Sequence, residues 1–161
     1  MSSILRYVEF LSLGIWLGSI IFLSFVVAPG AFATLGSRDQ AGALVGLALG
    51  RMHVLGIVCG AIFLAARGAM SLLAGRGLSA VLAPAALLVL LMLLLTGASQ
   101  YGVSARMAHL RQPMVSVDRA PEDNPLRIEF NRLHRASVRL ELAVLLAGLA
   151  ALFFTTRERP L

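Results

Sequence analysis

Four apolar stretches, each about 20 residues long, are the feature that most restricts how this chain can fold. They cover residues 8–27, 47–66, 79–98 and 137–156. An α-helix of this length crosses the hydrocarbon core of a bilayer and satisfies its own backbone hydrogen bonds there. The sequence therefore predicts an all-α, polytopic membrane protein. We expect one four-span transmembrane domain over residues 1–161, folded as a four-helix bundle.

The composition agrees with a chain that lies in lipid. Hydrophobic residues make up 58% of it and charged residues only 14%, whereas a soluble domain carries roughly a quarter charged residues. All 14 basic residues are arginine, and the formal net charge is +6. Because these arginines stand near the ends of the apolar stretches, they favour lipid headgroups over nucleic acid as their partner. We expect the lipid bilayer as the surroundings and no nucleic-acid partner.

The third and fourth helices are predicted to extend beyond the membrane. Residues 101–136 should form an antiparallel helical hairpin there, because its two arms carry matching apolar stripes. The stripes are Val103, Met107, Leu110 and Met114 on one arm, and Leu126, Phe130 and Leu133 on the other. Two capping signals mark helix starts: Ser37 with Gln40 before the second helix, and Asn124-Pro125 before the fourth.

An even number of spans places both termini on one side of the membrane. We expect residues 67–78 to connect the second and third spans on that side, with Glu9 at the interface near Arg6. Arg6 precedes the first span, and a neutral Arg38–Asp39 pair follows it. This difference favours cytoplasmic termini by the positive-inside rule. We expect a multi-pass protein of the bacterial inner membrane.

Glycines recur on one face of the second helix and on part of the first. They are Gly42, Gly46, Gly50, Gly56 and Gly60 on the second helix, and Gly14 and Gly18 on the first. Small residues at such spacing let another helix backbone approach closely in lipid. Two interpretations remain: packing between the first two helices, or an interface with a second copy or a larger membrane complex.

A polar cluster is predicted inside the bundle. His53 and Glu141 should face the interior at similar depth, within direct or one-water reach, because neither is easily satisfied by lipid. His134 and Ser137 share the face of Glu141, and Thr96, Ser99 and Gln100 reach this level from the third helix. The cluster is interpreted either as a hydrogen-bond network between helices or as a site for a substrate, protons or ions.

Four further arginines are expected to bind lipid headgroups. Arg132, Arg135 and Arg139 lie on the fourth helix opposite to Glu141. Arg51 lies opposite to the glycine face of the second helix, at a depth from which its long side chain can extend back to the interface.

The sequence predicts no metal site, no cofactor and no enzyme. The three histidines fall at different heights along their helices, whereas a metal needs its ligands within a few ångströms of each other. No phosphate-binding loop, nucleophile elbow or His-Glu-x-x-His motif is present.

Three stretches carry a resemblance to a known family. They are Gly14-Ile15-Trp16-Leu17-Gly18, Ala28-Pro29-Gly30-Ala31-Phe32 and Phe130-Asn131-Arg132-Leu133-His134-Arg135-Ala136-Ser137. With these stretches the chain resembles small four-pass membrane proteins grouped with transmembrane protein 205, a domain of unknown function. A weaker similarity links it to the four-pass copper-resistance membrane domain, whose methionine and histidine ligand clusters are missing here. The resemblance implies four spans and no settled biochemical activity.

Two functions are compatible with these features. The first is a non-catalytic accessory or structural subunit that packs against itself or a larger membrane complex. The alternative is a transporter or resistance factor for a small solute or a metal ion, acting as an oligomer.

Overall fold

The helices of this protein are longer than its apolar stretches. The computed structural model describes residues 2–75, 83–114, 116–117 and 119–157. Its elements are α1 (Ser2–Phe22), η1 (Leu23–Val27), α2 (Ala28–Thr34), α3 (Arg38–Leu73), α4 (Pro84–Gly97), η3 (Ala98–Ser104), α5 (Ala105–Arg111) and α6 (Pro125–Arg157). No strand occurs among the described residues. The predicted all-α fold is confirmed.

Four helical segments are long and apolar enough to cross a membrane. They are Ser3–Thr34, Arg38–Leu73, Pro84–Arg111 and Pro125–Arg157. The chain is therefore a multi-pass membrane protein surrounded by lipid. The beginning of the predicted third span, residues 79–82, lies outside the described residues.

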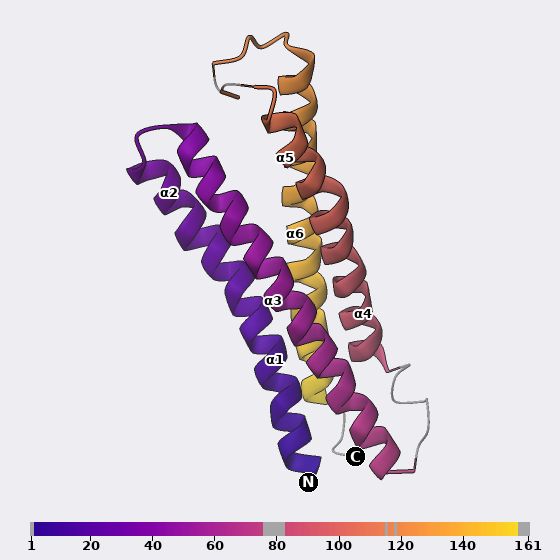
Figure 1. Cartoon of the computed structure of the whole chain (residues 1–161). Helices are drawn as coiled ribbons and strands as arrows, with labels where there is room; N and C mark the ends of the chain where they lie inside the picture. The colour runs from indigo at the N-terminus through magenta and orange to yellow at the C-terminus, as the bar shows by residue number, and fades with distance from the viewer. Residues whose placement is uncertain (1, 76–82, 115, 118, 158–161) are drawn as a thin grey trace.

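The four segments form two pairs that meet at one end and diverge at the other. Figure 1 shows α1 beside α3, and α4 beside α6, with the start of α1 and the end of α6 at the same end of the molecule. We call this the closed end. Towards α2 and α5 the two pairs separate, and we call that the open end. Neither η1 nor α2 makes an extensive contact with α6.

A single hydrophobic core joins the two pairs. Its largest fully buried side chains are Trp16, Phe63, Leu13, Ile20 and Met92. Many leucines, isoleucines and phenylalanines are exposed on the outer surface. In lipid, exposed apolar side chains carry no penalty, so tight interior packing holds the helices together.

Two glycines of α3 make room for an aromatic ring rather than for a second backbone. A Cβ atom on Gly60 would lie 2.9 Å from Cζ3 of Trp16 and 2.7 Å from Cδ2 of Leu93. Gly56 likewise faces the Trp16 indole. These two positions thus pack internally, as one interpretation predicted, but against a side chain.

The other glycines do not pack helix against helix within the chain. A Cβ on Gly14, Gly18 or Gly46 would meet no other part of the described chain within 4 Å. At these positions the interpretation as an interface stays a prediction. Gly42 and Gly50 face side chains, with Cβ distances of 3.0 Å to Arg111 and 3.9 Å to Gln100. Spacing alone cannot tell whether a neighbouring helix, a side chain or lipid lies beside a glycine.

The helical hairpin is present, and it has a small core of its own. Leu110, Met114, Val117 and Phe130 are buried together, with Leu133 packed against them. Both predicted helix starts are also confirmed. The Ser37 hydroxyl accepts a hydrogen bond from the Gln40 amide at 3.1 Å, and the Asn124 side chain accepts one from Leu126 N at 2.9 Å.

Asp39 ties the hairpin loop to the start of α3. Its Oδ1 accepts a hydrogen bond from Val117 N at 3.2 Å, and its Oδ2 accepts one from the Ser116 hydroxyl. The two helix pairs are therefore connected across the open end by hydrogen bonds.

The prediction that Arg67 stands in a connecting loop was wrong. Because α3 continues to Leu73, Arg67 lies inside the helix, buried, and its guanidinium forms an ion pair with Glu9 of α1. Glu9 is buried as well, rather than at the interface near Arg6.

Candidate functional site: a polar cluster at the end of a cleft

Four polar side chains meet where α3, η3 and α6 adjoin. His53 Nε2 lies 2.6 Å from Glu141 Oε1, and His53 Nδ1 lies 2.7 Å from Gln100 Oε1. The Ser99 hydroxyl donates to the same Glu141 oxygen at 3.2 Å. His53 and Ser99 are fully buried, while the Glu141 side chain is 15% exposed. We call these four residues the polar cluster.

The distances place a proton between His53 and Glu141. With Gln100 Oε1 as the acceptor, Nδ1 of His53 carries a hydrogen and donates it. Nε2 and the Glu141 oxygen then need one proton between them, since two lone pairs at 2.6 Å would repel. That proton gives either an imidazolium with a carboxylate or a neutral imidazole with a carboxylic acid. Both forms have zero net charge, which suits a site inside a membrane.

A π-helical turn presents two consecutive residues to the cluster. Ser99 and Gln100 both belong to η3, which runs from Ala98 to Ser104 between α4 and α5. In a regular α-helix, neighbouring side chains point about 100° apart. Turns of this kind are rare and occur often at functional sites. A second one, η1, lies in the first span at Leu23–Val27.

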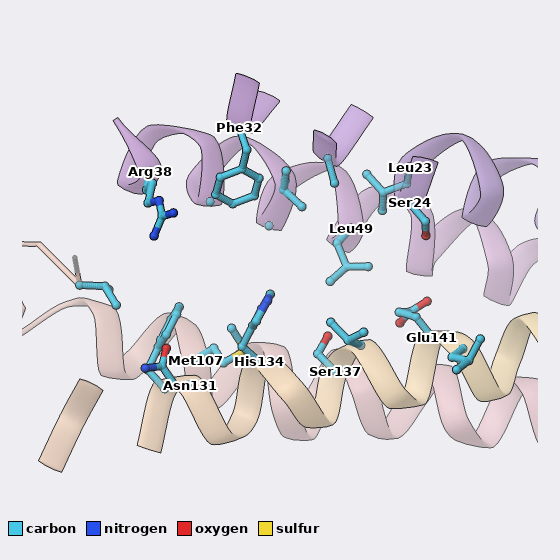
Figure 2. A pocket seen from close by; sticks show the side chains of 18 of the residues that line it. Leu23, Ser24, Phe32, Arg38, Leu49, Met107, Asn131, His134, Ser137 and Glu141 are labelled. Atoms are coloured by element: carbon cyan, nitrogen blue, oxygen red, sulfur yellow. The ribbon is translucent and has the colours of Figure 1, made fainter. Parts of the chain in front are cut away.

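A cleft of about 800 Å³ lies between the diverging helix pairs and reaches the polar cluster. Figure 2 shows His134, Ser137 and Glu141 extending from α6 into it, with Arg38 and Glu141 at opposite ends. Most of the wall is apolar. The lining residues are Ile20, Leu23, Ser24, Phe25, Ala28, Phe32, Arg38, Asp39, Gly42, Val45, Gly46, Leu49, Met107, Arg111, Val117, Phe130, Asn131, His134, Ser137, Val138, Glu141, Leu142 and Leu145.

The structure separates the predicted polar residues into three groups. The predicted direct contact between His53 and Glu141 is present. Ser137 and His134 line the cleft but lie outside the hydrogen-bonded cluster; Ser137 is buried and His134 is exposed. Thr96 is buried in α4, in the turn before η3.

The four predicted headgroup-binding arginines all have exposed side chains. Arg132, Arg135 and Arg139 lie on α6 and Arg51 on α3. None of them lines the cleft. Their contact with lipid headgroups stays a prediction.

Sequence reasoning did not find the cleft or its two arginines, Arg38 and Arg111. Helical periodicity shows which face of a helix is buried, but it does not show where two helix pairs diverge. Among the described residues, no group of three or more His, Cys, Asp or Glu side chains is arranged to hold a metal.

Comparison with known families gives one match. A family described as a domain of unknown function, DUF4149, matches residues 11–115. This region contains His53, Ser99 and Gln100, and it ends before α6 and Glu141. Comparisons with curated proteins and with solved structures find no match.

Proposed function

The chain belongs to the DUF4149 family, whose function is unknown, and we propose that it is a membrane protein that binds a small amphiphilic solute in its cleft. One observation carries this proposal: Glu141, which shares a proton with His53, lies at the end of an 800 Å³ cleft. Of the two functions compatible with the sequence, this supports a transporter or resistance factor for a small solute.

The shape of the cleft is typical of a small-molecule site. Ligand sites commonly have volumes of about 300–1,000 Å³, apolar walls and a few converging polar groups. Here Leu23, Leu49 and Leu142 contribute apolar wall, and His134, Ser137 and Glu141 place polar groups along one side. A solute with one apolar and one polar part matches that arrangement.

We propose that the site binds without catalysing a reaction. A serine nucleophile needs a histidine nitrogen free to take its proton. Both ring nitrogens of His53 are engaged, by Gln100 and by Glu141. The Ser99 hydroxyl donates to Glu141 instead.

We further propose that the protein acts as an oligomer. Four helices that diverge at one end leave the cleft bordered by exposed side chains such as Phe25 and Leu142. A second copy would complete the wall of a pathway through the bilayer.

An apolar carbodiimide tests whether Glu141 is reachable from the cleft. Dicyclohexylcarbodiimide enters membranes and modifies protonated carboxyl groups, and modified residues are found by mass spectrometry. We expect modification of Glu141 in the purified full chain, and protection by at least one of three probes: dodecyl phosphate, dodecyltrimethylammonium or dodecanol. Glu129 is the matched control, because it lies on the same helix, pairs with Arg106 outside the cleft and is partly exposed. Modification of Glu141 with no protection by any probe would refute the binding site.

The accessory-subunit function remains a second candidate because of Gly14 and Gly18. Both are exposed on α1, one helical turn apart, with open space beside them. A partner helix could approach closely there. Replacing both by leucine should reduce the mass of any detergent-extracted complex, whereas Gly68→Leu, also in open space, should not. Equal masses for the wild type, the double leucine variant and Gly68→Leu would exclude this surface as an interface.

Two finer properties also remain proposals: a bacterial inner-membrane location with cytoplasmic termini, and membership of the group that includes transmembrane protein 205. Two of the three stretches that carry the resemblance lie inside the matched region, and residues 130–137 lie outside it. An impermeant thiol reagent should label Ser116→Cys but not Ser3→Cys in intact cells. The opposite pattern would reverse the orientation.

A further inference from the structure

Two arginines stand at the end of the cleft opposite to Glu141, and the polar cluster does not use them. Arg38 is the first residue of α3, and Arg111 is the last residue of α5. Both line the cleft. Within the described part of the chain, neither forms an ion pair.

Arg111 is held in place beside α3. Its guanidinium carbon lies 5.4 Å from the centre of the Phe130 ring. Its Nη2 atom lies 3.0 Å from the position that a Cβ on Gly42 would occupy, so the glycine leaves room for the guanidinium. The Nε atom is buried and has no hydrogen-bond acceptor among the described residues. A buried donor without an acceptor costs free energy.

One acidic residue, Asp39, lies at this end of the cleft. Its carboxylate accepts hydrogen bonds from Val117 N and the Ser116 hydroxyl and keeps its negative charge. Glu141 is bonded to His53 and Ser99. Glu141 lies seven residues after His134 along α6, and this spacing corresponds to roughly 10 Å along the helix axis. Two arginines and one aspartate give the end near Arg38 and Arg111 a formal charge of +1.

Between its ends the cleft is long and apolar. Its α6 wall extends from Phe130 to Leu145, which is roughly 22 Å of helix. Phe25 and Leu142 line it and are 70% and 54% exposed on the outer surface. An alkyl chain can thus enter from the bilayer.

We propose that the ligand of the cleft is a single-chain amphiphile with an anionic, phosphate-type head. The head binds between Arg38 and Arg111, and the chain lies along the apolar wall towards Glu141. Arginine suits this role because its planar fork binds phosphate oxygens in pairs. This inference rests on the proposed function, since it names the ligand class of the same cleft.

The test compares probes that share a twelve-carbon chain and differ in the head. Native mass spectrometry of the full chain, in a non-ionic detergent, measures the affinity for dodecyl phosphate and for dodecyltrimethylammonium. We expect dodecyl phosphate to bind at least about tenfold more tightly, because a hydrogen bond to a charged group contributes that much. Arg111→Gln and Arg38→Gln should each reduce its affinity about tenfold, with dodecyltrimethylammonium unaffected.

Arg106→Gln is the matched control. Arg106 lies on the same helix as Arg111 but is exposed, pairs with Glu129 and does not line the cleft. An equal loss of affinity in Arg106→Gln would mean that surface charge attracts the probe, which overturns the proposal. Arg38 has an exposed side chain, so Arg38→Gln keeps the test informative if Arg111→Gln does not fold.

The remaining outcomes separate this inference from the proposed function. Tighter binding of dodecyltrimethylammonium, or of dodecanol in the carbodiimide assay, overturns the anionic head and leaves a solute site in the cleft. Failure of all three probes to bind or to protect Glu141 overturns both.

Discussion

Among the described residues, two pairs of an acid and a base lie inside the bundle, and their surroundings differ. At the closed end, Glu9 and Arg67 are almost fully buried between α1 and α3, and neither lines the cleft. Glu141 and His53 lie farther along the bundle, where Glu141 reaches the cleft. Arginine stays charged at any ordinary pH, whereas histidine can give up a proton. The first pair is thus fixed in its charge, and the second can exchange a proton.

This difference separates a structural pair from a functional one. A permanent ion pair without solvent contact connects helices and has no way to respond to a ligand. A pair that shares a proton beside a cleft can respond, because a ligand at Glu141 changes where the proton lies. The following three predictions test this contrast, from the largest expected effect to the smallest.

Breaking the pair at the closed end should have the largest effect. Arg67→Met removes the guanidinium that pairs with the buried Glu9 carboxylate, and such changes cost about 3–5 kcal/mol of folding free energy. The double variant Glu9→Leu/Arg67→Met should recover most of that loss, because both charges of the pair are removed together. Thermal unfolding in detergent measures both. A double variant as unstable as the single one would show that the pair acts through something other than its charge.

Filling glycines should destabilise the closed half of the bundle more than the open half. Gly60→Ala places a Cβ against Trp16 and Leu93, so it should cost about 1–3 kcal/mol through overpacking. Gly46→Ala meets open space on a helix face and should be neutral or stabilising by up to about 1 kcal/mol. The two variants differ only in position. Equal melting temperatures would contradict the difference in packing between the ends.

Glu141→Gln should have the smallest effect on stability. The glutamine amide can donate to Nε2 of a neutral His53, so the hydrogen bond is kept and the loss should stay below about 1 kcal/mol. Thermal unfolding in detergent measures this loss. A loss as large as that of Arg67→Met would make this pair structural too.

The parts of the fold that follow from helical period and length could be predicted from the sequence. The orientation of His53 and Glu141 toward each other is one such part, because each helix fixes the direction and depth of its own side chains. The burial of Arg67 was not predicted, because its partner Glu9 lies 58 residues away along the chain. The contact between Trp16 and Gly60 was not predicted for the same reason, because these two residues are also far apart along the chain.

The cleft could not be predicted, for a related physical reason. It arises where α1 and α3 diverge from α4 and α6, and that divergence depends on the packing of whole helices rather than on any local pattern. The π-helical turn that brings Ser99 and Gln100 together breaks the regular period on which the sequence analysis relied.

The hydrogen bonds of Asp39 have a mechanical consequence. They join the start of α3 to loop residues 116 and 117, across the end where the helix pairs would otherwise be free to separate. Each hydrogen bond to a charged group contributes about 1.5–3 kcal/mol, so widening the open end by rupture of this link costs about 3–6 kcal/mol. The link between the start of α3 and the hairpin loop thus depends on one carboxylate.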